Sequence, residues 1–236
     1  MENGELFDRL YKRLKDKGNE RRIIGILGLV GSGKSHFTDE FVQFLKRKGI
    51  DALHLNMDIY NSSTRAERNR IVEALRKNYD PNWPRKAYPQ DETLIKDHLT
   101  NIREGKNFLT HNLCDPSTKE LSLSMKFLFE KNKIKIKIGN EEHEYNSSRL
   151  WILCDGVKLL KYREHFDYTI FIKSSPEIRF NRLLERNKML ASPANIRRDL
   201  FDDVERNLIE EYLLDEKNTD IVVDNNDFNN RKIIKI

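Results

Sequence analysis

The chain has 236 residues, of which 38% are hydrophobic, 9% aromatic and 34% charged, and its formal net charge is +5 at pH 7. This balance is typical of a charge-rich globular protein that can bury the core of one α/β domain, and it excludes a disordered chain. No apolar run approaches the roughly 18 residues of a transmembrane helix, and the first residues lack the apolar segment of a signal peptide. The cysteines, Cys114 and Cys154, show no metal-ligand spacing and require no disulfide, so we expect a cytoplasmic location.

The basic excess raises the question of a nucleic-acid partner. Basic and acidic residues, however, alternate along the segments predicted as helices, which is typical of solvated helix faces. Nucleic acid is therefore an unfavoured partner, and no membrane is expected. The sequence leaves the oligomeric state open, with a homo-oligomer as one alternative.

Hydrophobic periodicity predicts helices and strands that alternate along the chain. The predicted helices cover residues 1–17, 34–48, 64–78, 91–105, 177–187 and 195–214. The predicted strands cover residues 22–27, 51–57, 150–154, 167–172 and 220–223, with a hairpin over 133–138 and 141–145. Residues 80–89 contain three prolines and cannot form a helix. Such an alternation predicts a parallel sheet with helices on both faces and a ligand site beyond the carboxyl ends of the strands.

A phosphate-binding motif follows the first predicted strand. The pattern G-x-x-x-x-G-K-[ST] is matched by Gly28-Leu29-Val30-Gly31-Ser32-Gly33-Lys34-Ser35. Its glycines allow the backbone to wrap around phosphate oxygens, and the following helix contributes its free N–H groups. Lys34 is expected to reach the β- and γ-phosphates, and the Ser35 hydroxyl to hold Mg²⁺. The motif therefore predicts ATP and Mg²⁺, bound by Gly28, Gly31, Ser32, Gly33, Lys34 and Ser35.

A carboxylate closes the second predicted strand. Asp58 follows residues 51–57, where it could face the γ-phosphate from the acceptor side and take a proton from an attacking hydroxyl. The alternative is that Asp58 only caps a helix or forms a turn, which is common for an aspartate after a strand.

Over residues 22–227 the chain resembles the uridine kinase and phosphoribulokinase family, which also contains a bacterial pantothenate kinase type. The resemblance is carried, in order, by the phosphate loop and by residues 56–60, 79–87, 103–106, 113–115, 151–157, 171–186, 198–200 and 220–223. It implies that Asp58 is the catalytic base. It also implies that Asp155, where the family has a glutamate, lies near Mg²⁺; the alternative for Asp155 is a turn-forming Asp-Gly pair.

The same resemblance implies a helical lid that closes over the phosphates and excludes water. Its arginines would be Arg182 and Arg186, with catalytic roles, and Arg198, which would contact the nucleotide. The alternative for each arginine is a solvated helix face. The implied fold class is α/β, a P-loop NTPase-type parallel sheet flanked by helices, with a small β-hairpin insertion and this lid. The expected organisation is an N-terminal helix over 1–20 and a kinase domain over 21–236, which contains the hairpin at 133–146 and the lid at 177–200.

The chain departs from the family pattern on the acceptor side. Tyr60 is in the aromatic position after Asp58 but Asn61 replaces the following tyrosine, and the base-binding histidine and arginine are not recognisable in residues 116–120. The predicted activity is transfer of the γ-phosphate of ATP to a hydroxyl of a small molecule, with a nucleoside as the expected acceptor. The alternatives are a pantothenate or sugar-phosphate kinase, a regulatory P-loop NTPase, and a module that binds ATP without transferring phosphate.

Overall fold

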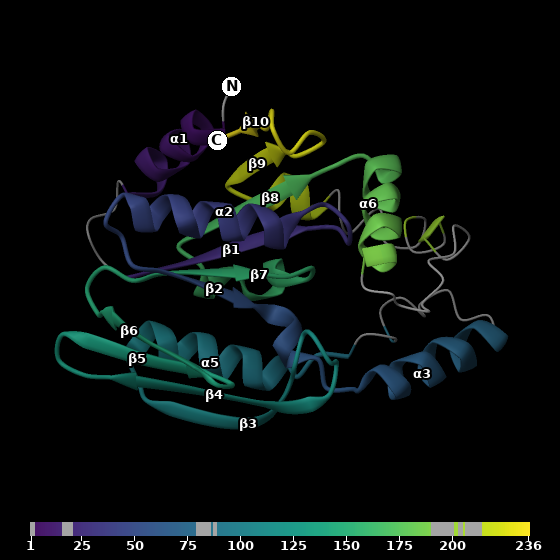
Figure 1. Cartoon of the computed structure of the whole chain (residues 1–236), viewed down its shortest axis with the longest axis horizontal. Helices are drawn as coiled ribbons and strands as arrows, with labels where there is room; N and C mark the ends of the chain where they lie inside the picture. Colours follow the sequence, from purple (N-terminus) through teal and green to yellow (C-terminus); the bar gives the residue numbers. More distant parts are fainter. Residues whose placement is uncertain are drawn as a thin grey trace.

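A computed structural model describes residues 3–15, 21–78, 86, 89–189, 201–202, 205 and 214–236. Its centre is a six-stranded sheet in the order β10-β9-β8-β1-β7-β2 (Figure 1). The strands are β1 Arg22–Gly28, β2 Ala52–Asn56, β7 Trp151–Asp155, β8 Tyr168–Lys173, β9 Ile221–Asp224 and β10 Lys232–Lys235. All neighbours pair in parallel except β10, which is antiparallel to β9 at one edge. The parallel sheet predicted from the sequence is confirmed, and β10 is an addition to it.

Helices cover both faces of this sheet. The helices of the described residues are α1 Asn3–Lys15, α2 Lys34–Arg47, α3 Arg65–Lys77, α5 Glu92–Glu104 and α6 Pro176–Met189, with the 3-10 helices η1 Met57–Tyr60 and η2 Leu159–His165. α1 and α2 cover one face of the sheet and α5 the other, whereas α6 and α3 lie at its end (Figure 1). The alternation of side chains along β1 explains the layering. Ile24 and Ile26 join one buried cluster with the apolar residues of α1 and α2, whereas Ile23 and Leu27 join a second cluster with α5. The described helices include none that is long and apolar enough to cross a membrane.

A second sheet completes the core on the α5 side. Its four strands, in the order β3-β4-β5-β6, are all antiparallel. They are β3 Phe108–Cys114, β4 Leu121–Phe129, β5 Lys133–Ile138 and β6 Glu141–Asn146. The alternation of Lys and Ile in β5 buries Ile134 and Ile136 against α5. The predicted hairpin is therefore present as β5 and β6, but it is one half of a four-stranded sheet.

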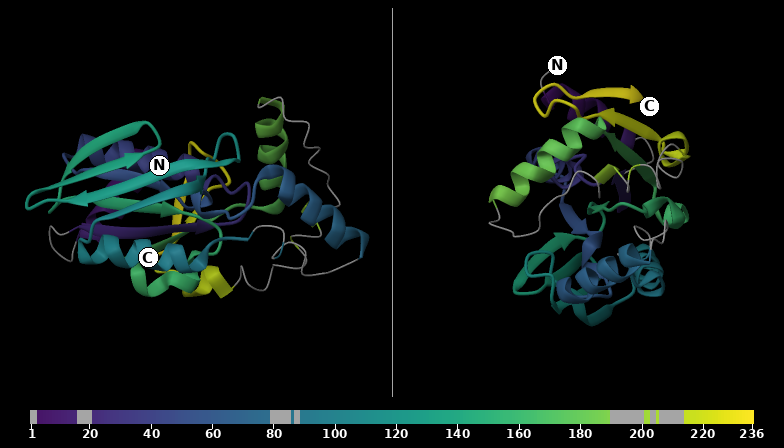
Figure 2. Two further views of the ribbon diagram at one scale, coloured as in Figure 1. Left: turned by 90° about the horizontal axis from the view of Figure 1, so that it is seen from below. Right: turned by 90° about the vertical axis from the view of Figure 1, so that its right-hand side faces the viewer.

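The carboxyl ends of β1, β2 and β7 lie at the same end of the molecule, next to α6 and α3 (Figures 1 and 2). Residues 190–200 and most of 203–213 lie outside the described residues, so the predicted helix over 195–214 is described only at residues 201, 202, 205 and 214, which are all helical. The division of the chain at residue 20 and the extent of a lid stay predictions. The parallel pairing of β1, β7 and β2 brings the carboxyl ends of these strands, and the segments that follow them, to one edge of the sheet.

Candidate functional site

The backbone of the phosphate loop requires its glycines. Gly31 and Gly33 have φ angles of 82° and 86°, in the left-handed region that disfavours side chains. A Cβ on Gly31 would lie 2.5 Å from the carbonyl oxygen of Arg179, and one on Gly33 would lie 2.7 Å from the side chains of Asn225 and Phe228. The loop is therefore packed tightly against α6 and the segment after β9.

Three side chains hold one carbonyl group of this loop. The Ser32 carbonyl oxygen accepts hydrogen bonds from Asn225 Nδ2 at 2.6 Å, Ser174 Oγ at 3.2 Å and Arg182 Nη1 at 3.2 Å. Ser32 itself is fully buried. These hydrogen bonds within the protein fix the conformation of the loop. They therefore lower the entropic cost of ordering the loop when a ligand binds.

Lys34 is held at the mouth of the loop. Its Nζ donates a hydrogen bond of 3.0 Å to the carbonyl oxygen of Leu29. Burial lowers the pKa of Lys34, and the negative charges of Asp155 and Asp58 partly offset this effect. Both carboxylates are therefore close enough to act electrostatically on the lysine that is expected to meet the β- and γ-phosphates.

Asp155 lies at the end of β7, beside the start of α2, and is only 4% exposed. Its carboxylate accepts a hydrogen bond of 2.5 Å from Ser35 Oγ and contacts His54 Nε2 at 2.9 Å. The other ring nitrogen of His54 lies 2.7 Å from Asp39 of α2. A continuous series of contacts between polar side chains therefore begins at the last residue of the phosphate loop. It runs through Ser35, Asp155, His54 and Asp39.

The contacts between Asp155 and His54 shift the pKa of each group towards its charged form. Burial alone would raise the pKa of Asp155, but the hydrogen bonds from His54 and Ser35 and the charge of Lys34 hold it below its usual value. Burial alone would lower the pKa of His54, but its contacts with Asp155 and Asp39 raise it. Asp155 is therefore ionised at neutral pH.

These groups fit Mg²⁺. The ion prefers oxygen ligands, binds few protein groups, and takes most of its remaining ligands from phosphates and water. The Ser35 hydroxyl and the Asp155 carboxylate supply two such oxygens 2.5 Å apart at the start of α2. No group of three or more acidic, histidine or cysteine side chains within the described ranges offers an all-protein metal site. The donor set therefore fits an Mg²⁺ site that a bound nucleotide would complete.

Asp58 lies in η1, directly after β2, and is half-buried. The capping role in this 3-10 helix belongs to Asn56, whose side chain accepts a hydrogen bond of 2.8 Å from the Asp58 N–H. Within the part of the chain that the structure describes, the Asp58 carboxylate has no hydrogen bond or ion pair. Its side chain is therefore available for a ligand.

The arginines predicted for the lid occupy different environments. Arg182 lies beneath the loop, where its Nη2 donates to the carbonyl oxygens of Asn225 and Asn226 at 2.7 and 3.1 Å and its guanidinium stacks 3.8 Å over the Phe228 ring. Arg186 is exposed, and its charge contributes to the lowered pKa of Lys34. Arg198 lies outside the described residues.

Several residues of the site were not predicted from the sequence. Arg179 is 1% exposed and forms an ion pair with Glu205 beneath the loop. Arg231 is fully buried and connects Asn225 to Glu40 of α2, at 2.5 Å to each partner. A buried arginine outside any sequence motif has no local pattern that marks it as a site residue. His54, in contrast, is a polar residue between two leucines in β2, and this pattern could have marked it as a candidate.

Comparison with known proteins agrees with the fold. No protein-family model matches the chain, and no curated protein matches it in sequence. Among solved structures, phosphoribulokinase from Rhodobacter spheroides superposes with a TM-score of 0.57 at 12% identity, over 88% of this chain and 71% of that one. D-glycerate 3-kinase from Cryptococcus neoformans var. grubii superposes with a TM-score of 0.54 at 12% identity, over 98% of each chain.

The chain therefore has the fold of the P-loop kinases, a mixed parallel sheet flanked by helices. At the level of the fold, these neighbours agree with the resemblance to the uridine kinase and phosphoribulokinase group found in the sequence.

Proposed function

We propose that this protein is a small-molecule kinase that transfers the γ-phosphate of ATP to a hydroxyl group. The observation that carries the proposal is the position of Asp58. Its carboxylate is near enough to Lys34 to influence the pKa of that lysine, and it has no structural partner among the described residues. In a kinase, a carboxylate at this position orients the acceptor hydroxyl and takes its proton.

In the proposed reaction, the phosphate loop and Lys34 bind the β- and γ-phosphates of ATP. Ser35 and Asp155 would hold Mg²⁺, which neutralises charge on these phosphates. Asp58 orients the acceptor hydroxyl and takes its proton as the new P–O bond forms and the bond to ADP breaks. Positioning and charge neutralisation supply most of the rate, since there is little covalent chemistry for the protein to perform.

We infer that the acceptor is a nucleoside. The support comes from the sequence resemblance to uridine kinases, because the structural neighbours act on chemically different acceptors according to their names. Glycerate, pantothenate and sugar phosphates are therefore the competing acceptors that an assay must include.

The test is ADP release with ATP and Mg²⁺, measured for wild type and Asp58→Asn across uridine, cytidine, glycerate, pantothenate and ribulose 5-phosphate. We expect turnover that depends on a nucleoside and falls by about 10²- to 10⁴-fold in Asp58→Asn, while ATP affinity is retained. Asp97→Asn, which removes an exposed carboxylate from α5, should leave turnover unchanged. Acceptor-independent ADP release would refute the kinase, and equal activity of Asp58→Asn and Asp97→Asn would refute the role of Asp58.

A further inference from the structure

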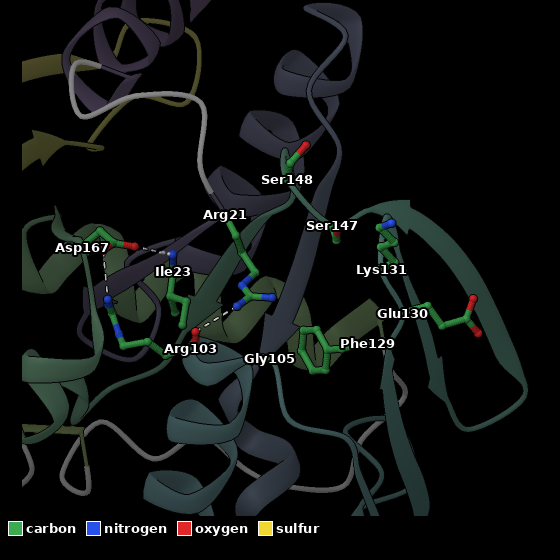
Figure 3. A pocket seen from close by; sticks show the side chains of 10 residues that line it. All are labelled: Arg21, Ile23, Arg103, Gly105, Phe129, Glu130, Lys131, Ser147, Ser148 and Asp167. Atoms are coloured by element: carbon green, nitrogen blue, oxygen red, sulfur yellow. Dashed lines mark hydrogen bonds and ion pairs between the residues drawn. The ribbon is translucent and has the colours of Figure 1, made fainter.

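A pocket lies where β1 begins, at the end of this strand opposite the phosphate loop, which follows its carboxyl end. Figure 3 shows the residues that line it. Its volume is about 790 Å³. It is formed where β1 begins, by the residues that precede β7 and β8, by the end of α5 and by the end of β4. β1 has seven residues, so a rise of about 3.3 Å per residue separates the pocket from the loop by roughly 20 Å. None of its residues takes part in the proposed reaction.

Arg21 is the central basic group of this pocket. Its Nη2 donates a hydrogen bond of 2.9 Å to the carbonyl oxygen of Arg103, and its guanidinium lies 4.9 Å from the centre of the Phe129 ring. Burial and the neighbouring charge of Arg103 lower the pKa of Arg21. Among the described residues no carboxylate pairs with Arg21. This half-buried guanidinium therefore lies beside the positive charge of Arg103 and has no counter-ion of its own.

The carboxylates that line the pocket are already engaged. Asp167 accepts hydrogen bonds from the Ile23 N–H at 2.8 Å and from Arg103 Nη2 at 3.2 Å. Glu130 forms an ion pair of 2.8 Å with Lys135, which does not line the pocket, and Figure 3 shows the Glu130 side chain pointing away from Arg21.

Lys131 is a further lining cation, exposed and without an ion pair in the described part of the chain. The pocket therefore has positive charge that its own acidic residues do not neutralise. An anion placed between Arg21 and Lys131 would supply the missing counter-charge, and a guanidinium binds phosphate and carboxylate through paired N–H donors.

We propose that this pocket binds a small organic anion, with its phosphate or carboxylate group on Arg21 and Lys131 and its planar apolar part against Phe129. The Phe129 ring lines the pocket beside the Arg21 guanidinium, so an anionic group on Arg21 brings the apolar part of the ligand next to this ring. The Ser147 hydroxyl, for which the described residues provide no partner, adds a hydrogen-bond donor at the rim. A phosphate is distinguished from a carboxylate by the test.

The test is calorimetric titration of the full chain with naphthyl phosphate, naphthoate and neutral naphthol. A non-hydrolysable ATP analogue and Mg²⁺ are present at saturation, so that the phosphate loop is occupied. We expect one anion per chain to bind and naphthol not to bind, and the tighter of the two anions identifies the favoured group. Binding of neither anion overturns the proposal.

Matched variants locate the binding independently of any kinase activity. Arg21→Gln should weaken anion binding by about tenfold, because it removes the charge-assisted hydrogen bonds. Arg47→Gln, the same change at an exposed arginine of α2 that does not line the pocket, should leave the affinity unchanged. Equal affinities of Arg21→Gln and wild type contradict the assignment. If Arg21→Gln does not fold, Lys131→Gln, at an exposed position, must weaken binding severalfold, and undiminished binding in that variant overturns the proposal as well.

Discussion

The side-chain amide of Asn225 donates a hydrogen bond of 2.6 Å to the carbonyl oxygen of Ser32, across a separation of 193 positions in the chain. The amide oxygen of Asn225 accepts in turn from Arg231 Nε at 2.5 Å. Arg231 forms an ion pair with Glu40 of α2, the helix that follows the phosphate loop. The segment between β9 and β10 therefore contacts both the phosphate loop and the helix that follows it.

This relationship predicts the effect of Asn225→Ala. The substitution leaves the buried Arg231 Nε without its acceptor and removes one of the donors to Ser32. We expect the free energy of unfolding to fall by about 2 kcal/mol and ATP affinity to fall by about tenfold. Urea unfolding and nucleotide titration measure the two effects. Asn229→Ala, at an exposed position of the same segment, is the control. Unchanged ATP affinity in Asn225→Ala would show that the loop is fixed by its other contacts.

A second prediction concerns His54 as a positioning residue for Asp155. His54→Gln removes the imidazole ring that contacts both Asp155 and Asp39. The half-saturating Mg²⁺ concentration for activity should rise by about tenfold, while activity at saturating Mg²⁺ changes little, as is typical when a group that orients a metal ligand is lost. Titration of activity against Mg²⁺ at fixed ATP measures this. His143→Gln, at an exposed position of β6, should not alter the Mg²⁺ requirement. A parallel loss of activity at all Mg²⁺ concentrations would argue for a different role.

A third prediction concerns pH and His98, a buried residue of α5. Its ring nitrogens contact Tyr60 OH at 3.0 Å and Thr110 Oγ1 at 2.7 Å, and burial lowers its pKa to about 4. In the unfolded chain the pKa of a histidine is about 6.5. As the pH falls below that value, the unfolded state takes up a proton that the folded state does not. Stability is therefore lost from about pH 6.5 down to about pH 4 and then levels off.

The corresponding measurement is the free energy of unfolding in urea at pH 7 and pH 5, for wild type and for His98→Asn, which does not titrate. Wild type should lose up to about 2 kcal/mol more than the variant over this interval. The comparison cancels the titration of the remaining histidines. Equal losses of unfolding free energy in both proteins would mean that the pKa of His98 is not lowered in the folded state.

Local patterns were enough to predict the elements that carry the phosphate loop. The apolar run of β1, the glycine motif and the amphipathic α2 follow one another without interruption, so their order alone defines the geometry. The strand-end positions of Asp58 and Asp155 followed from the same reasoning, because parallel strands bring their carboxyl ends to one edge. The roles of both residues in catalysis stay predictions.

Other parts of the structure depend on contacts between distant segments. The pairing of β3 with β4 was not predicted, although the alternation in residues 121–129 gives a strand-like signal. β10 is a short edge strand whose register with β9 shifts between Ile233 and Lys235, and this pattern is too brief to recognise in a sequence. The contact of Asn225 with Ser32 joins residues that no spacing rule connects, and the same holds for the ion pair of Arg231 with Glu40.

The attachment of the phosphate loop to the segment around Asn225 has a consequence for synthesis of the protein. The loop leaves the ribosome roughly 190 residues before the side chains that fix its backbone, whereas domains generally form as chains emerge from their N-termini. A nascent chain would therefore expose the G-K-S motif while it still lacks Asn225 and Arg231. For the proposed kinase, tight ATP binding is therefore expected to begin only when synthesis has passed these residues.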